Sequence, residues 1–153
     1  MPRLRFLHSC LDRAMDKLTP ERRSWNMSRI RGRDTSPEKR VRSLLHRLGF
    51  RFTLRRKDLP GRPDIVLPSR KAAVFVHGCF WHRHERCRNS VLPKTRAEFW
   101  LAKLTGNVER DRIKAAELKA LGWRVLTVWE CEIKNEPRLS KKLRLAIGKE
   151  RCG

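Results

Sequence analysis

The chain has 153 residues, enough for one hydrophobic core and too few for two domains of ordinary size. Its 38 Lys and Arg residues outnumber 16 acidic residues, and the resulting formal net charge of +22 far exceeds what solubility requires. Such a charge attracts polyanions, so nucleic acid is the predicted partner. The alternatives are a basic surface that serves only solubility, a ribosomal protein and a membrane-surface protein. No apolar run approaches the roughly 20 residues of a membrane span.

The cysteines are odd in number and unevenly spaced, which indicates a reducing compartment and metal ligation rather than a disulfide framework. No small-residue cleavage site follows the weakly apolar opening, so secretion is not predicted. We therefore expect a cytoplasmic, nucleoid-associated protein. Cys10 and Cys152 are expected to take no part in its site.

Two helices are predicted first. An N-cap followed by proline at 19–21 predicts a basic helix through about Ile30. The segment 36–38 starts a second helix, which Gly49 ends. The apolar residues that recur at helical spacing on its expected buried face are Val41, Leu44, Leu45 and Leu48.

Three short strands are predicted next. Residues 50–54 alternate between apolar and polar, which is typical of a half-buried strand. The segments DIVL at 64–67 and AAVFV at 72–76 are largely apolar, and Pro68-Ser69 between them has the spacing of a hairpin turn. The second and third strands are therefore expected to pair with each other.

A pair of helices is predicted to follow. Thr95 and Glu98 have the spacing of a capping box, which predicts a helix through about Leu104. Asn107 is expected to cap a second helix that runs to Gly122.

A buried strand and an amphipathic helix are predicted to close the chain. The β-branched and aromatic content of 123–129 favours a strand, and apolar residues recur at helical spacing over 137–147. The whole order predicts an α/β fold, with a central mixed sheet flanked by helices on its faces.

Several cysteines and a histidine have the chemistry of a metal site. Cys79, His84 and Cys87 lie in one short segment, and Cys131 follows the last predicted strand. Three soft thiolates and one imidazole are the ligands of a closed tetrahedral zinc site. The alternative is that Cys79 and Cys131 are simply small buried apolar residues.

Asp64 and two histidines suggest catalysis. Asp64 stands at a strand start and His77 follows the end of the next strand, so a hairpin would bring them to the same end of the sheet. A carboxylate there can hold Mg²⁺ with a carbonyl such as that of Val76, while His77 and His82 can move protons. The combination suits phosphodiester hydrolysis. Taken alone, Asp64 is more typical of a strand-capping or loop carboxylate than of a catalytic one.

Five stretches of the chain, covering about residues 16–147, carry specific motifs: WNMSRIRGRDTSPEKRVRSLLHRLGFRF, GRPDIVLPSRKAAVFVHGCFWHRH, TRAEFW, NVERDR and GWRVLTVWECEI. Together they resemble the very short patch repair (Vsr) DNA mismatch endonuclease family. The resemblance implies a restriction-endonuclease-like fold with a structural zinc. It also implies Mg²⁺-dependent nicking of one strand of double-stranded DNA, 5′ of the thymine in a T·G mismatch, which arises when 5-methylcytosine deaminates.

The resemblance also assigns roles to individual residues. Asp64 and the Val76 carbonyl correspond to the metal ligands of the family, and His82 to its catalytic histidine. The supporting polar residues correspond to Glu38, His77 and Asp111. The zinc ligands correspond to Cys79, His84, Cys87 and Cys131. The gap between His84 and Cys87 is one residue longer than the family pattern, which predicts either a bulge or another ligand in place of Cys87.

Phe80 and Trp81 are adjacent large aromatic residues that cannot both point into a core from a loop. One alternative is that one packs and the other is partly exposed. The other is that they enter the base stack as a wedge, which costs less beside a T·G pair than beside a matched pair. Met27 corresponds to a residue that the family inserts from the opposite groove; its alternative is a helix-packing contact.

The sequence therefore predicts a monomeric DNA repair nickase with mismatch-repair proteins as candidate partners. Two alternatives stay open: a non-catalytic zinc-stabilised DNA-binding module, and a nuclease of the same fold that acts on another DNA structure. We expect one domain over residues 16–148. Residues 1–15 are expected to be either a disordered basic tail or an extension translated from a start codon upstream of Met15. Residues 149–153 are expected to be a C-terminal tail.

Overall fold

The computed structural model describes residues 19–28 and 32–148, which fall in two compact units, Met1–Arg33 and Asp34–Gly153. The first unit contains helix α1, Pro20–Ser28. The Thr19 hydroxyl accepts a hydrogen bond from the backbone N–H of Arg22, so the predicted start of this helix is confirmed. Its predicted end near Ile30 lies outside the described residues.

The second unit is built on a three-stranded sheet in the order β1-β2-β3. Strand β1, Ile65–Leu67, pairs antiparallel with β2, Ala72–His77, through a one-turn 3₁₀ segment. Strand β3, Arg124–Trp129, lies parallel to β2, in a register that pairs its last residue with His77. The predicted hairpin and the predicted mixed sheet are therefore both confirmed.

The first predicted strand is wrong as a full strand. In segment 50–54 only Thr53 pairs with the sheet, through two backbone hydrogen bonds of 2.7 and 2.9 Å with Val66. Phe50 and Phe52 still pack against the core, which explains the alternating pattern. The backbone turns away at Arg55, which has a positive φ of 60°, so no further ladder bonds can form.

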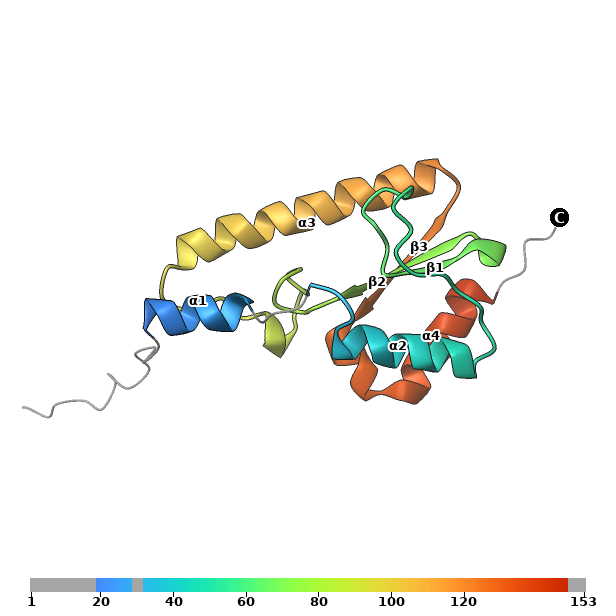
Figure 1. Cartoon of the computed structure of the whole chain (residues 1–153), viewed down its shortest axis with the longest axis horizontal. Coiled ribbons are helices and arrows are strands. Elements are labelled where there is room, and N and C mark those ends of the chain that lie inside the picture. Colours follow the sequence, from blue (N-terminus) through green and yellow to red (C-terminus); the bar gives the residue numbers. More distant parts are fainter. Residues whose placement is uncertain (1–18, 29–31, 149–153) are drawn as a thin grey trace, which may run out of the picture. The chain divides into compact units, whose positions relative to one another are not determined.

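Helices cover both faces of this sheet (Figure 1). One face packs against α2, Ser36–Arg47, and α4, Glu136–Ile147, and the other packs against the C-terminal part of α3. The first core contains Val41, Leu44, Leu45, Ile65, Leu67, Ala72, Val74, Val128, Leu139, Leu143 and Ile147. The smaller second core contains Leu59, Val66, Ala73 and Leu118. Alternate strand residues thus point into different cores, as the pleat of a sheet requires.

The predicted apolar face of α2 is confirmed. Its Val41, Leu44 and Leu45 are buried against the sheet, and Leu48 is half-buried just beyond the helix. The N-cap is Thr35, whose hydroxyl accepts a hydrogen bond from the N–H of Glu38 at 3.4 Å. The cap lies directly before Ser36, so the predicted start of this helix is confirmed.

The predicted pair of helices at 95–122 is wrong. A single helix, α3, runs over Ala97–Ala120. Its N-cap is Arg96, with no side-chain cap, so the predicted capping box does not form. Asn107 does not start a helix; its amide donates to the carbonyl of Trp81 at 3.0 Å. The buried leucines at 104 and 118 lie on both sides of this point, so packing holds the two halves in one helix.

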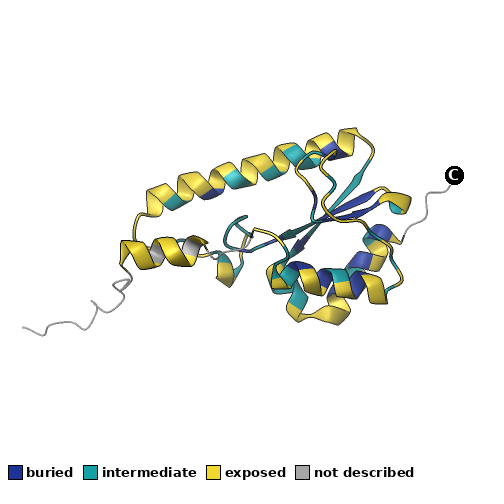
Figure 2. Cartoon of the chain, viewed as in Figure 1, coloured by how far each residue is buried: buried dark blue, intermediate teal, exposed yellow. Residues whose placement is uncertain are grey.

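The last predicted helix is confirmed as α4. The Asn135 side chain caps it by accepting from the N–H of Arg138 at 3.2 Å. Figure 2 shows the buried residues concentrated in the sheet and in the helix faces turned toward it. Over the described ranges, no helix combines the length and apolarity that crossing a bilayer would require.

Candidate active site and metal centre

Asp64 lies one residue before β1, at the end of the hairpin where β2 finishes. Its Oδ2 accepts a hydrogen bond of 2.7 Å from the backbone N–H of Val76. This bond fixes the Asp64 side chain beside the last two residues of β2, Val76 and His77. The hairpin thus brings Asp64 and the end of β2 together, as the sequence predicted. Within the described part of the chain, Oδ1 of Asp64 makes no hydrogen bond.

The environment of Asp64 disfavours its negative charge when no cation is bound. Burial raises the pKa of this carboxyl to about 6, and the nearby Glu38 carboxylate adds to the rise. The Val76 N–H, Arg42 and His82 act in the opposite direction. A carboxylate that is desolvated beside a second carboxylate is a favourable place for a divalent cation, because the cation relieves both penalties.

Glu38 is almost fully buried, with 6% of its surface exposed, and its carboxylate already has three hydrogen-bond donors. Oε2 accepts from the N–H of Asp34 and from Arg42, each at 3.0 Å, and Oε1 accepts from the Thr35 hydroxyl at 3.0 Å. Arg42 also pairs with Asp34 at 2.7 Å. These contacts close the N-terminus of α2, so Glu38 has a structural function whatever its part in catalysis.

The two histidines form a stacked pair. Strand alternation directs His77 to the face of the sheet that α3 covers, and the ring of His82 lies parallel to it with centroids 3.8 Å apart and a 4° interplanar angle. Nδ1 of His82 lies 2.5 Å from Oδ2 of Asp111 on α3. The carboxylate therefore fixes the orientation of the His82 ring and directs its Nε2 away from α3.

His77 and His82 differ in environment. Burial, with the neighbouring His82 as the next cause, lowers the pKa of His77 to about 4, so His77 is neutral near pH 7. Only 8% of the His77 residue is exposed, whereas 27% of the His82 side chain is exposed. His82 is consequently the histidine that water and a substrate can reach.

A second cluster contains three thiols and an imidazole. The ligand atoms of Cys79, His84, Cys87 and Cys131 all lie within 4.8 Å of one another. Nδ1 of His84 is 3.4 Å from Sγ of Cys131. Tetrahedral zinc with ordinary bond lengths would place a nitrogen and a sulfur ligand about 3.5 Å apart. The geometry therefore fits a zinc ion held by four protein ligands, as the sequence predicted.

The chemistry of the thiols supports the same fit. Burial raises the pKa of Cys79 to about 12 and also raises the pKa of Cys131. A hydrogen bond from the N–H of Asn89 lowers the pKa of Cys87. A cation at the centre of the cluster would be needed to keep all three thiols deprotonated at neutral pH. The extra residue before Cys87 is accommodated as a bulge, since Arg86 has a positive φ of 56° and the thiol still joins the cluster.

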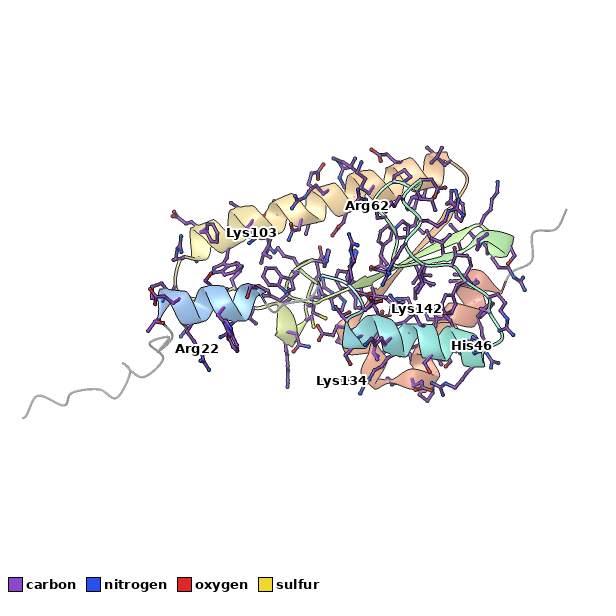
Figure 3. The ribbon with its side chains drawn as sticks, viewed as in Figure 1. Arg22, His46, Arg62, Lys103, Lys134 and Lys142 are labelled. Carbon is purple, nitrogen blue, oxygen red and sulfur yellow. The ribbon has the colours of Figure 1, made fainter. Side chains whose placement is uncertain are left out.

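Aromatic side chains form a third group beside the loop. Phe80 and Trp81 are both half-buried, and each packs edge-to-face with Trp100 of α3, with centroids 5.5 and 6.0 Å apart. Lys103, labelled in Figure 3, lies over the Trp81 and Trp100 rings at 5.7 and 5.6 Å. The exposed Phe99 extends the group.

Trp100 was missed by the sequence reasoning. The only signal for Trp100 in the sequence is the adjacent aromatic pair in TRAEFW. The side chain of Met27 lies outside what the structure describes. The sequence therefore located the aromatic loop but not its partner on α3.

The arrangement of the helices and strands has a counterpart among solved structures. The catalytic domain of homing endonuclease I-Bth0305I superposes with a TM-score of 0.51, at 22% sequence identity, over 72% of this chain and 92% of that domain. At this level of identity the similarity concerns the fold.

Sequence relatives are much closer. The type II nicking enzyme V.XorIIP of Xanthomonas oryzae pv. oryzae is 54% identical over 129 residues, or 84% of this chain and 94% of the relative. The DNA mismatch endonuclease Vsr of Escherichia coli (strain K12) is 49% identical over 125 residues, or 82% of this chain and 78% of the relative. The type II nicking enzyme V.NmeAIP of Neisseria meningitidis is 43% identical over 84% of this chain and 91% of the relative.

These relatives and the site define a DNA endonuclease of the nicking type. A sequence model described as DNA mismatch endonuclease Vsr matches residues 15–89. The chain belongs to the Vsr DNA mismatch endonuclease family. Membership decides against the alternative of a non-catalytic DNA-binding module.

Proposed function

We propose that the chain is a Mg²⁺-dependent endonuclease that nicks one strand of double-stranded DNA 5′ of the thymine in a T·G mismatch. The observation that carries the proposal is the convergence of Asp64, His82 and Asp111 at one end of a restriction-endonuclease-like sheet. Membership of the mismatch endonuclease family supports the substrate. We also propose that deamination of 5-methylcytosine produces these mismatches.

The residues around Asp64 fit a hard divalent cation. Its free Oδ1 and the neighbouring Val76 carbonyl are oxygen donors of the kind that Mg²⁺ takes, with water and phosphate oxygens for the rest of the shell. Bound Mg²⁺ would act as a Lewis acid on the phosphate and would stabilise the leaving oxygen. Glu38 lies near Asp64, but its carboxylate accepts hydrogen bonds from Arg42 and from the N–H of Asp34 at the start of α2.

His82 is proposed to carry the proton-transfer step. Asp111 holds Nδ1, which leaves Nε2 to exchange a proton with water or with the leaving oxygen. Asp111 would also stabilise the imidazolium that results. The stacked His77 is neutral near pH 7, so a positive charge on His82 meets no second cation across the 3.8 Å between the rings.

We propose that the Cys79, His84, Cys87 and Cys131 cluster holds one structural Zn²⁺. Four protein ligands leave no open coordination position, which is the arrangement of structural rather than catalytic zinc. The ion would join the loop after β2 to the segment after β3 and so hold His82 near the sheet.

Phe80, Trp81 and Trp100 are proposed to form a wedge that tests the base stack. Two of the rings come from the loop that carries His82, so insertion of a ring would be coupled to the position of the nick. Apolar wedges unstack a base step at a cost that is lowest where pairing is weak, which favours a T·G pair. Met27 is proposed as the wedge from the opposite groove.

The nicking proposal is tested with end-labelled duplexes that differ at one position, T·G, T·A or C·G, and with a panel of bulged and single-stranded substrates. Wild type should nick only the T·G duplex, 5′ of the thymine, and only with Mg²⁺. Asp64→Ala should retain binding and lose cutting. Preferential cutting of another DNA structure would overturn the proposed substrate and support the remaining alternative.

The wedge is tested with Trp81→Ala in protein that still contains zinc and melts like wild type. We expect the ratio of T·G to T·A binding to fall by about tenfold, because stacking of one base on an aromatic ring contributes roughly 1–3 kcal/mol. Unchanged discrimination would mean that Trp81 serves only to pack the loop.

We further propose a monomer that acts in the cytoplasm on nucleoid DNA. The net charge of +22 supports association with DNA. Mismatch-repair proteins stay candidate partners.

A further inference from the structure

Trp129 is the last residue of β3, and it lies between the two histidine-containing clusters. The parallel register pairs it with His77 at the end of β2, and strand alternation directs both side chains to the face that α3 covers. The Trp129 ring meets His77 edge-to-face, with centroids 5.4 Å apart and a 71° interplanar angle. It also stacks on His84, with centroids 4.2 Å apart and a 9° angle. Among the described residues, only Trp129 makes ring contacts with both clusters.

The contacts of Trp129 complete an unbroken series of side chains. Cys131 touches His84, which stacks on Trp129. Trp129 in turn contacts His77, which stacks on His82, and His82 is bonded to Asp111. The series begins at the thiol cluster and ends at the proton-transfer residue.

The backbone of Trp129 is held firmly enough for this role. Its N–H donates to Oε2 of Glu132 at 2.8 Å, and both carboxylate oxygens of Glu132 accept from Lys142 of α4 at 2.9 Å. Lys142, labelled in Figure 3, also donates to the Thr127 carbonyl at 2.8 Å. The end of β3 is thus fastened to α4 on both sides of the tryptophan.

The loop backbone alone does not fix the histidine rings. The N–H of His82 donates to the Gly78 carbonyl at 3.2 Å, and the N–H of His84 to the Cys79 carbonyl at 2.9 Å, so the loop is folded on itself. The second side-chain torsion of a histidine is broad, however, and needs side-chain contacts to select one orientation. Asp111 holds one edge of His82, and the stacked His77 holds its face. His77 itself contacts the rings of Trp129 and of Phe75, at 5.4 and 5.8 Å.

We propose that Trp129 is a positioning residue that couples the Cys79, His84, Cys87 and Cys131 metal site to the catalytic histidine. A metal ion at the cluster orients His84, and the Trp129 ring transmits that orientation through His77 to His82. The inference rests on the proposed zinc and on the proposed role of His82, and it goes further in giving the zinc site an effect on the rate of nicking.

The first measurement needs neither DNA nor a variant. Protein with ¹⁵N-labelled histidine is prepared with Zn²⁺ and with Cd²⁺, a larger ion that thiolate-rich sites also accept. In wild type, the exchange should shift the imidazole resonances of His84 and also those of His77 and His82. A shift confined to His84 overturns the coupling. A wild type that binds neither ion overturns it as well.

The second measurement uses Trp129→Leu, which keeps apolar bulk but removes the flat ring, with Trp123→Leu before the start of the same strand as the matched control. In Trp129→Leu the metal exchange should no longer shift His82. Single-turnover nicking at saturating T·G DNA should fall by about 10- to 100-fold, with the Kd for DNA nearly unchanged. Trp129→Phe should recover part of the rate, and Trp123→Leu should retain it.

Zinc content and Tm are recorded for each variant. A zinc-loaded Trp129→Leu that nicks like wild type overturns the inference, as does an equal loss in Trp123→Leu. If Trp129→Leu does not fold, the wild-type metal exchange and Trp129→Phe still decide. If wild type does not nick T·G DNA, the proposed substrate fails, while the resonance measurement still tests the coupling by itself.

Discussion

The loop after β2 contributes to two clusters with opposite chemistry. The thiol cluster brings three sulfur atoms and one nitrogen within 4.8 Å, around the fully buried Cys79. The cluster at Asp64 offers oxygen and imidazole donors, and its His82 and Asp111 side chains are 27% and 33% exposed. Soft ligands that fill a tetrahedron hold an ion permanently, whereas hard ligands with room for water let an ion and a phosphate exchange. The first cluster is thus suited to holding shape and the second to turnover.

Removing the His82 side chain should distinguish the functions of the two clusters most clearly, because it should affect the nicking rate and not the zinc content. His82→Ala should lower the single-turnover nicking rate by roughly 10²- to 10⁴-fold, the range typical of general acid–base groups. Zinc content, Tm and DNA affinity should stay near wild type, because His82 is not a ligand of the thiol cluster. His46→Ala, an exposed histidine on α2, is the control. A normal rate in His82→Ala would remove it from the proposed chemistry.

Breaking the thiol cluster should have the reverse signature. Cys131→Ser should reduce zinc from about one ion per chain and lower the Tm by on the order of 10 °C, equivalent to about 3 kcal/mol. Elemental analysis and calorimetry measure both effects, and Cys152→Ser supplies the same substitution at a cysteine that is not among the four proposed ligands. If wild type contained no zinc and Cys131→Ser melted at the same temperature as wild type, a structural ion would be ruled out.

Neutralising Asp64 should stabilise the Mg²⁺-free protein. The pKa of Asp64, about 6 when folded, exceeds the value of about 3.9 in an unfolded chain, so its charge costs stability above about pH 6, and that cost fades below about pH 4. Asp64→Asn should therefore raise the free energy of unfolding by up to about 3 kcal/mol near pH 7.5 and by about half as much near pH 5. Denaturant titrations in Mg²⁺-free, zinc-containing protein measure this, and a less stable variant at pH 7.5 would contradict it.

Glu38→Gln should have the smallest effect of these substitutions on stability and on nicking rate. Its hydrogen bonds close α2, so we expect a loss of about 1 kcal/mol in stability and less than a tenfold change in nicking rate. A rate loss as large as that of His82→Ala, at normal Tm, would instead make Glu38 part of the catalytic chemistry.

Much of the fold was predictable where a pattern was local. The leucines of α2 repeat at helical spacing, and Pro68-Ser69 lies between two apolar strands, so the helix and the hairpin followed directly. The break predicted near Asn107 was wrong because a glycine and a capping residue carry only about 1 kcal/mol of local preference. Burial of Leu104 and Leu118 outweighs that preference.

The candidate site was predictable to a similar extent. Residue type and order suggested the thiol cluster and the pairing of Asp64 with the end of β2, and the geometry agrees with both. The contacts of Trp129 and Trp100 could not be predicted. They depend on the register between β2 and β3 and on the uninterrupted course of α3, and no short motif encodes either.

Because α3 is uninterrupted, it fixes the distance between side chains at its two ends. Trp100 and Asp111 are eleven residues apart on one helix, which fixes about 16 Å between the aromatic group and the carboxylate that holds His82. One residue inserted between them would turn the aromatic end by about 100° and advance it by about 1.5 Å, whereas a whole turn would restore its face but displace it by about 5.4 Å. The uninterrupted length of α3 therefore fixes the distance between the Trp100 ring, which contacts Phe80 and Trp81, and the carboxylate that orients His82, and this distance cannot change by small steps.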